Sequence, residues 1–387
     1  MKALRWVYYT VMAACLIAGM YTGLRIYYIV FFTQLLVVIA MIVINLWTFY
    51  SFSYKQELSD KVCVKGDDTL LHLEIVNERP VPLSLIEVHV SVVSPGDNSS
   101  LIFSLAPFSG QTFQIPVHSP YRGRFGVGMT KMKITDIFGL ITIPFDMRRL
   151  SYYRMAELVV LPKAQMPSSV SGDIADTKLF SAAYLKHAEQ GDSVSGARLY
   201  HDGDALRRIN WKKSAQLGKL FVKQYEYPER EHIMLLVDTG LYGLTGEEAL
   251  VYADTVCESA ACIALYSLSK NRAVSVQNST GIVSSIECES MSGFDALRRH
   301  LAILPFEQQT HLAATIQKTY VEAAKAQSLF ILTHELTPQL AGILDRTFAA
   351  RTAVTVVLVG GRSSFGRIHT LSVLPGCDAA ASLSGLF

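Results

Sequence analysis

The sequence predicts a multidomain chain with two N-terminal transmembrane helices, a β-sandwich-like domain, and an α/β domain with a parallel sheet and helices. Residues 6–54 contain a single charged residue, Arg25, which is typical of a membrane anchor. Residues 56–165 carry short runs of alternating apolar and polar residues, which favour half-buried strands. From residue 232 on, continuous apolar runs alternate with amphipathic stretches, which indicates parallel strands joined by helices.

We therefore divide the 387 residues into four parts. They are a transmembrane helical hairpin (1–55), a β-sandwich-like domain (56–165), a linker with a distinctive polar segment (166–231), and an α/β domain (232–387). The net charge of +2 gives no field that would attract nucleic acid, so we expect no nucleic-acid partner. The six cysteines form no CxxC pair, which indicates a reducing compartment without disulfides. Cys257 and Cys262 fall on an apolar helical pattern and are predicted core residues.

Arg25 divides the apolar N-terminal stretch into two predicted spans, residues 6–24 and 26–54. A bilayer core of about 30 Å requires about 20 apolar residues in a helix, which the first run barely supplies and the second exceeds. More apolar residues follow Leu24, so a cleaved signal peptide is not expected. One long re-entrant or tilted helix is the alternative. Gln34 and Asn45 either hydrogen-bond between the helices or are tolerated singly.

Basic residues flank both predicted spans. Lys2 and Arg5 precede the first span, and Lys55, Lys61 and Lys65 follow the second. The positive-inside rule then predicts a multi-pass protein of the cell membrane with both termini in the cytoplasm and the Arg25 turn outside.

Turn signals separate the predicted strands 70–76, 86–92, 111–118 and 126–134 of the β-sandwich-like domain. Residues 166–195 are rich in Ser, Gly, Asp and Ala, and we predict a linker there with one short helix at 179–189. In the α/β domain we predict strands and helices by their apolar period. The strands are 233–237, 273–277, 282–286, 329–333 and 354–359, and the helices are 247–270, 295–304, 310–325 and 338–349. Thr245 and Thr337 are the predicted N-caps of the first and last of these helices.

The most distinctive stretch is RLYHDGDALRRINWKKSA at residues 198–215, which continues through Gly218 and Leu220. It closely resembles the signature of the bacterial domain-of-unknown-function family number 58. The segments YRGRF at 121–125, DIFGL at 136–140 and LVVLP at 158–162 resemble further elements of that family. The resemblance implies a von Willebrand A-like fold for the α/β domain. It also implies two partners, a MoxR-type AAA+ ATPase and a transglutaminase-like membrane protein.

The signature gathers opposite charges around a tryptophan. Its charged and aromatic members are Asp204, Arg207, Arg208, Trp211 and Lys212. Arginine pairs bidentately with carboxylates and tryptophan stacks under cations, so these residues form either a polar network that fixes the linker or a partner-binding surface. The sequence departs from the family pattern at Ala205, Asn210 and Gln216, where it lacks two acidic residues and one cation.

The resemblance also implies a metal site, because von Willebrand A-like domains often hold Mg²⁺ through D-x-S-x-S, a loop threonine and a later aspartate. Asp238 and Thr239 begin the corresponding segment, but Gly240 and Tyr242 stand where the serines are expected. His334 stands in place of the later aspartate and is a poor ligand for Mg²⁺. We therefore predict a degenerate site around Asp238, Thr239 and His334 without a metal, and no cofactor.

These observations predict a non-enzymatic membrane adaptor or scaffold whose α/β domain docks partner proteins during assembly or remodelling of an envelope complex. No catalytic residue is predicted, because no nucleophile has a base at a suitable spacing, and no phosphate-binding loop is present. One alternative is a metal-dependent ligand binder or an enzyme that uses Asp238 at the carboxyl end of the sheet. Another is a structural envelope protein that acts through its sandwich.

Overall fold

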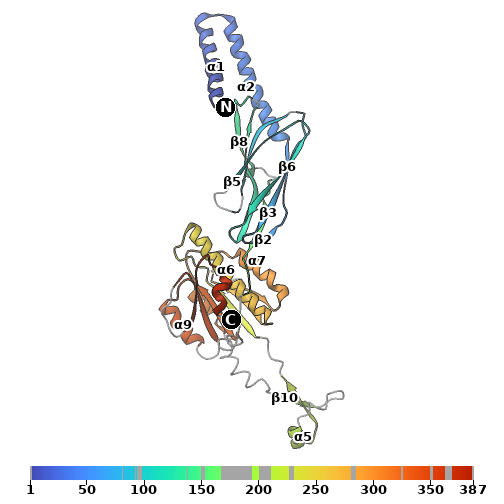
Figure 1. The fold of residues 1–387 in the computed structure, drawn as a ribbon, viewed down its shortest axis with the longest axis vertical. Coiled ribbons are helices and arrows are strands. Elements are labelled where there is room, and N and C mark those ends of the chain that lie inside the picture. Colours follow the sequence, from blue (N-terminus) through green and yellow to red (C-terminus); the bar gives the residue numbers. More distant parts are fainter. Residues whose placement is uncertain are drawn as a thin grey trace. The chain divides into compact units, whose positions relative to one another are not determined.

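The computed structural model describes residues 2–80, 82–91, 93, 98–136, 138–149, 153–166, 194–199, 211–225, 231–279, 285–323, 326–348, 352–361 and 368–385 (Figure 1). The chain divides into two compact units, residues 1–161 and 162–387. The predicted helix at 179–189 lies outside the described residues.

The first unit begins with a hairpin of two helices, α1 (Lys2–Thr22) and α2 (Arg25–Ser51). Gly23 turns the chain between them at a φ of 67°, a left-handed conformation that glycine adopts without steric cost. Helix α2 continues directly into strand β1 (Phe52–Leu58). Residues 52–54, which the sequence assigned to the second span, are therefore strand. The hydroxyl of Tyr8 donates to the Gln34 carbonyl at 2.9 Å, whereas Gln34 Oε1 and Asn45 Nδ2 have no hydrogen-bond partner among the described residues.

Two described helical stretches are long and apolar enough to cross a membrane. The first is Arg25–Trp47 of α2, of which only 6% is buried. The second is α6 (Gly246–Ser269), which is 78% buried within the second unit and is therefore a core helix. Helix α1 is not among these stretches, so only the second of the two predicted spans meets this test by its length and composition.

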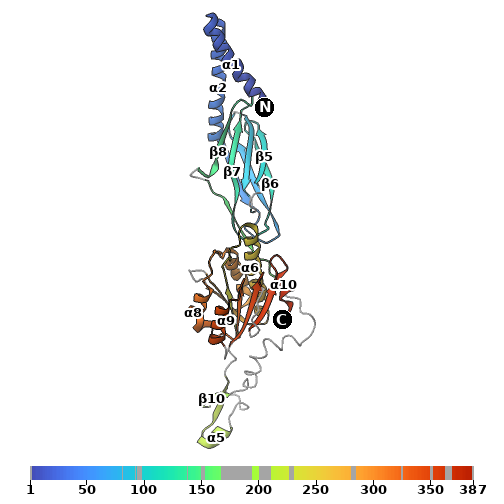
Figure 2. The same cartoon turned by 90° about the vertical axis from the view of Figure 1, so that its left-hand side faces the viewer.

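The described residues of the first unit then form nine strands, β1 to β9, in two sheets. Figures 1 and 2 show these sheets next to the helical hairpin. A three-stranded antiparallel sheet has the order β1-β3-β6, with β3 (Asp68–Asn77) and β6 (Gly110–His118). The larger sheet has the order β2-β9-β7-β4-β5, and β8 also pairs with β7. Its strands are β2 (Val62–Val64), β9 (Ala156–Leu161), β7 (Gly123–Thr135), β4 (Leu83–Ser91), β5 (Asn98–Leu105) and β8 (Thr142–Asp146).

One core joins the two sheets. Leu71, Leu73 and Ile75 alternate along β3 and are fully buried, and they pack in the same cluster as residues of β4 such as Val88. The alternation in the sequence therefore marks the face that each strand buries against the other sheet.

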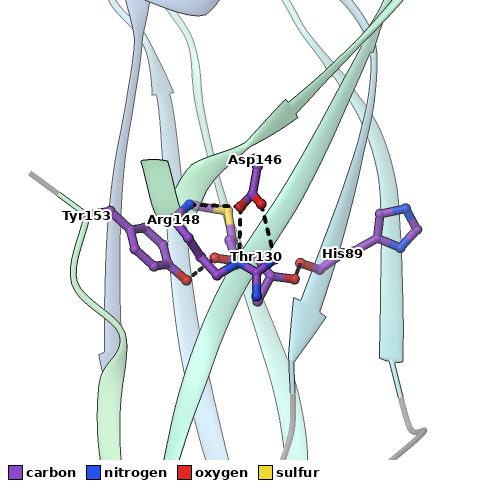
Figure 3. Close-up of polar contacts among 6 residues, drawn as sticks. His89, Thr130, Asp146, Arg148 and Tyr153 are labelled. Atoms are coloured by element: carbon purple, nitrogen blue, oxygen red, sulfur yellow. Dashed lines mark hydrogen bonds and ion pairs between the residues drawn. The ribbon is translucent and has the colours of Figure 1, made fainter. Parts of the chain in front are cut away.

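Polar contacts fasten the segment after β8 to the larger sheet (Figure 3). The Arg148 guanidinium in η1 (Met147–Arg149) pairs with Asp146 at 3.1 Å and holds the pKa of that carboxyl below its usual value. The Tyr153 hydroxyl donates to the Met129 carbonyl, and burial raises the pKa of Tyr153 to about 12. The connection between β8 and β9 is therefore tied to β7 by its side chains.

The second unit contains a six-stranded sheet of order β14-β13-β12-β15-β16-β17. Its strands are β12 (His232–Val237), β13 (Ala273–Asn278), β14 (Ser285–Cys288), β15 (Ser328–Thr333), β16 (Ala353–Val359) and β17 (His369–Val373). All neighbouring strands are parallel except β13 and β14, which pair antiparallel. The predicted all-parallel sheet is thus a mixed sheet with an antiparallel edge.

Helices cover both faces of this sheet, and β12 shows why. Ile233, Leu235 and Val237 pack in one cluster with α6, α7 (Phe294–Ile303) and α10 (Ala379–Ser382). Met234 and Leu236 pack in another with α8 (Leu312–Ala323) and α9 (Pro338–Phe348). Because successive side chains of a strand point to opposite faces, an unbroken apolar run is buried on both sides.

Several local predictions are confirmed in this unit. Cys257 and Cys262 of α6 are buried core residues. The Thr337 hydroxyl accepts the Leu340 N–H at 3.3 Å, as expected of the N-cap of α9. Thr245 occupies the N-cap position of α6 but makes no side-chain capping bond.

Candidate functional site at the carboxyl end of the α/β sheet

The carboxyl ends of β12 and β15 meet where the chain order of the sheet reverses direction. This switch point is where open α/β sheets usually bind ligands. Asp238 directly follows β12 and Thr333 ends β15. Asp238 is completely buried, so it is the first residue to test for a site at this edge.

One oxygen of Asp238, Oδ1, accepts hydrogen bonds from three parts of the chain. The Ser279 hydroxyl, just after β13, donates at 2.8 Å, and the Thr310 hydroxyl, just before α8, donates at 2.7 Å. The Gly240 N–H adds a bond at 3.1 Å. Oδ1 is therefore surrounded by donors that belong to the protein itself.

The other oxygen, Oδ2, accepts hydrogen bonds from two more hydroxyls. Thr333 donates at 2.8 Å, and the phenol of Tyr242, in the loop between β12 and α6, donates as well. The carboxylate thus receives five donors, which is about all that its lone pairs can accept. A buried charge costs free energy unless it is hydrogen-bonded in this way.

Tyr242 reaches Asp238 from a strained backbone position. Its φ is 52°, a left-handed conformation that is a genuine outlier for a bulky residue. Burial, and next the charge of Asp238, raise the pKa of the Tyr242 phenol. The phenol therefore keeps its proton and continues to donate to the carboxylate at any ordinary pH.

A loop closes over this edge of the sheet. The Glu307 N–H donates to the Thr239 carbonyl at 2.9 Å, and the Leu241 N–H donates to the Glu307 carbonyl at 2.8 Å. Gly240 has no room for a side chain, because a Cβ there would lie 2.8 Å from Thr310 Cβ. The serine that a metal-binding motif would place at this position cannot be accommodated in this arrangement.

His334 lies beside Asp238 but bonds elsewhere. Its Nδ1 is 2.8 Å from the Val359 carbonyl, which identifies Nδ1–H as the donor. Its ring packs against Tyr242 at 5.3 Å and Tyr252 at 5.4 Å between centroids. The segment is held close to Gly361, where a Cβ would lie only 1.8 Å from the His334 carbonyl oxygen.

The residues at this edge do not fit the Mg²⁺ that the family resemblance implies. A divalent cation requires oxygen lone pairs in near-octahedral array, but here both Asp238 oxygens face N–H and O–H protons. Thr239 uses its hydroxyl with Ser279 at 3.2 Å. Within the described residues, no group of three or more His, Cys, Asp or Glu side chains could hold a metal.

The sequence pointed to Asp238, Thr239 and His334. It did not point to Ser279, Thr310 and Thr333, which are the hydrogen-bond partners of Asp238. A hydroxyl residue at the end of a strand is too common to single out. The one available signal was the loop threonine of the metal-binding pattern, which Thr310 matches in type.

The signature residues are described only in part. Asp204, Arg207 and Arg208 lie outside the described residues. Trp211 and Lys212 begin helix α5 (Trp211–Leu217), and both are exposed. Helix α5 lies between β10 (Val194–Leu199) and β11 (Phe221–Tyr225), which pair antiparallel.

Ser214 is the buried anchor of this segment. Its hydroxyl accepts the Phe221 N–H at 2.9 Å and so ties α5 to β11. Three large apolar residues of the same segment are exposed, namely Trp211 at 65%, Leu217 at 56% and Leu220 at 43%.

Comparisons with solved structures give only low similarity. A β-glucosidase from Erythrobacter marinus is 12% identical, with 29% of this chain and 15% of that chain covered and a TM-score of 0.18. A β-glucosidase from Listeria innocua in complex with glucose is 13% identical, with 28% and 16% covered and a TM-score of 0.17. The DNA-bound alkylpurine DNA glycosylase AlkC from Pseudomonas fluorescens is 17% identical, with 25% and 30% covered and a TM-score of 0.16.

This chain thus spans between 15% and 30% of these structures, and TM-scores this low carry no argument about its fold or activity. No curated protein matches the chain. The family described as "Protein of unknown function DUF58" matches residues 196–363, which include the whole signature and the greater part of the α/β sheet. Residues 196–363 of this chain are therefore a DUF58 domain.

Proposed function

We propose that this protein is a membrane-anchored, non-enzymatic adaptor or scaffold that docks partner proteins through its cytoplasmic α/β unit. The observation that carries the proposal is the exposed apolar surface of the signature, formed by Trp211, Leu217 and Leu220. Tryptophan is enriched among the residues that dominate the energy of protein interfaces. Lys212 and Lys219 are also exposed there, which favours a partner with an apolar pocket and an acidic rim.

The closed arrangement around Asp238 favours a role in protein docking over a catalytic role. A catalytic carboxylate must reach its substrate, whereas Asp238 is fully buried and bonded to five donors of its own chain. The alternative of a metal-dependent binder or enzyme at Asp238 therefore requires that this network be dismantled first.

We further propose that the α/β unit is von Willebrand A-like, as the resemblance implies. An aspartate after the first strand, a loop threonine beside it and a residue after a later strand are the parts of that pattern. Asp238, Thr310 and the Thr333–His334 pair supply them at the switch point of the sheet. In this chain they hold the loops together.

The anchor is proposed to be the helical hairpin. Large apolar side chains of α2 such as Ile29, Phe32 and Leu36 are more than half exposed, and a watery environment would penalise this surface. A bilayer satisfies it at no cost, and by the positive-inside rule the basic flanks favour an orientation with both termini in the cytoplasm.

The orientation can be tested with a reporter enzyme fused after Phe387. We expect activity of a cytoplasmic reporter and none of a reporter that requires export. The reverse result would invert the proposed topology while leaving the anchor itself intact.

The proposed partner is a MoxR-type AAA+ ATPase, with a transglutaminase-like membrane protein as a second candidate, in the assembly or remodelling of an envelope complex. These partners rest on the family resemblance. The exposed apolar and basic side chains of the signature indicate where on this chain such a partner would bind.

The docking surface can be tested by the Trp211→Ala variant in a pull-down with the ATPase. We expect at least about a tenfold loss of affinity, since a central interface tryptophan often contributes 2 kcal/mol or more. Val321→Ala is the matched control, because Val321 on α8 is also 65% exposed but lies outside the signature. Equal retention of the ATPase by both variants would refute docking at this surface.

A further inference from the structure

The loop between β7 and β8, of which the structure describes Asp136 and residues 138–141, lies beside the first helix of the hairpin. Arg5 of α1 donates from Nε to the Gly139 carbonyl, and the Tyr9 hydroxyl contacts the Leu140 carbonyl at 3.5 Å. In both views of the fold, strand ends of the β domain reach the N-terminal end of α1 (Figures 1 and 2). The loop is therefore held at the depth of the first turns of α1.

That depth lies within the apolar span of α2. A Cβ on Gly19 of α1 would contact the Tyr28 ring of α2 at 3.3 Å, which sets the register of the antiparallel helices. Tyr9 precedes Gly19 by about ten residues, or roughly 15 Å along the helix. The neighbouring Tyr8 donates to the Gln34 carbonyl of α2, so this turn of α1 is level with residues inside the stretch Arg25–Trp47.

Several backbone polar groups of the described part of the loop are hydrogen-bonded within the protein. Buried Asp136 accepts the Phe138 N–H at 3.1 Å and the Ile141 N–H at 2.6 Å. The Gly139 N–H donates to the Asp136 carbonyl at 2.9 Å, and the Gly139 carbonyl accepts from Arg5. A loop at membrane depth is tolerated only when its backbone groups are paired in this way.

Phe138 is the large apolar side chain that this loop leaves exposed, at 55%, whereas neighbouring Leu140 is buried. Exposed residues of the two helices, Trp6 and Val43 among them, are apolar too. A soluble domain that displayed Phe138 to water would gain nothing from it, but beside the hairpin it adds to the exposed apolar surface of the helices.

We propose that the turn at residues 138–140 of this loop is a membrane-contacting element, with the Phe138 ring inserted among the lipids beside the helical hairpin. This inference rests on the proposed membrane anchor and adds a third element to it, from the β domain. The loop couples that domain to the bilayer surface, because the same loop is bonded to α1 and continues into the strands of the larger sheet.

Photo-crosslinking in lipid nanodiscs with the full-length chain tests the inference. The photoreactive residue p-benzoylphenylalanine replaces one side chain at a time, at Phe138, at Phe32 and at Leu70. Phe32 on α2 is the positive control, since it is 61% exposed within the span. Leu70 on β3 is the matched negative control, because it is partly exposed but lies away from the hairpin. It is seven residues along β3 from Asn77, which pairs with Phe52 at the point where β1 leaves the hairpin.

We expect lipid adducts at positions 32 and 138 and none at position 70. Adducts at 32 without adducts at 138 would overturn the inference about the loop and leave the anchor standing. Absence of adducts at both positions would overturn the anchor as well. Adducts at 70 as strong as those at 138 would show that the label reaches lipid without a specific contact, and would also overturn it.

Discussion

Helices α2 and α6 are both long and apolar but differ in what surrounds them. Both contain a stretch long and apolar enough to cross a membrane, yet that stretch is 6% buried in α2 and 78% buried in α6. The α/β unit covers its own apolar helix with the sheet and with α7 and α10. The hairpin leaves α2 uncovered within the described residues, which fits the membrane anchor proposed above.

The same difference extends to polar groups. The α/β unit satisfies the buried charge of Asp238 entirely with its own hydroxyls and one N–H. The hairpin, in contrast, leaves large apolar side chains of α2 exposed.

A charge placed in each helix is the strongest way to break this comparison. Ala260 of α6 is fully buried, so Ala260→Asp should destabilise the α/β unit by more than about 4 kcal/mol and prevent folding. Leu36 of α2 is 68% exposed, so Leu36→Asp should leave the unfolding of the α/β unit unchanged. It should instead disfavour membrane insertion by about 3 kcal/mol.

Limited proteolysis measures the first effect and alkaline extraction of membranes the second. If Leu36→Asp unfolded the α/β unit, or if it stayed in the membrane as firmly as the parent, α2 would not be the lipid-facing helix. Leu36→Ala serves as the control for the loss of the leucine side chain alone.

The Asp238 network sharpens the comparison at the level of one polar cluster. Asp238→Ala removes the acceptor of four hydroxyls and should lower the free energy of unfolding by about 3 kcal/mol or more. Tyr242→Phe removes a single donor and should cost about 1–2 kcal/mol. Denaturant unfolding of the detergent-solubilised chain measures both.

Tyr252→Phe is the matched control. The Tyr252 hydroxyl is buried beside the cluster without a hydrogen-bond partner in the described part of the chain, so its loss should be neutral or slightly stabilising. Addition of Mg²⁺ should leave the melting temperature of the parent unchanged. A clear rise with Mg²⁺ would show that the carboxylate is open to a cation, contrary to the closed edge described above.

The smallest expected effect is a loss of stability in strong base. Burial raises the pKa of Cys262, on α6, to about 11 from an ordinary value of 9.0. As the pH rises, the thiol of the unfolded chain therefore loses its proton before the thiol of the folded chain. The contribution of Cys262 to the free energy of unfolding is complete below pH 9.0 and declines as the pH rises toward 11. Tyr153 behaves alike between pH 10.0 and about 12.

Urea unfolding at a series of pH values from 8 to 11 measures this decline. Cys262→Ala should reduce the slope above pH 9.0, because it removes one of the two groups. A stability that is constant or rises over this interval would contradict the burial of α6.

Local signals explain how much of the fold could be predicted. The run 233–237, the helix after Thr245 and the cap at Thr337 were found because period, capping and turn residues act over a few positions. The direction of β14 could not be found this way, because an edge strand carries no local mark of parallel or antiparallel pairing.

The sequence by itself determined the positions of most strands and helices, the apolar hairpin and the family of residues 196–363. Only the tertiary structure decided what surrounds Asp238, because its partners Ser279, Thr310 and Thr333 lie 41, 72 and 95 residues away in the chain. It also decided that α6 is covered and α2 is not, since composition records how apolar a helix is but not what packs against it.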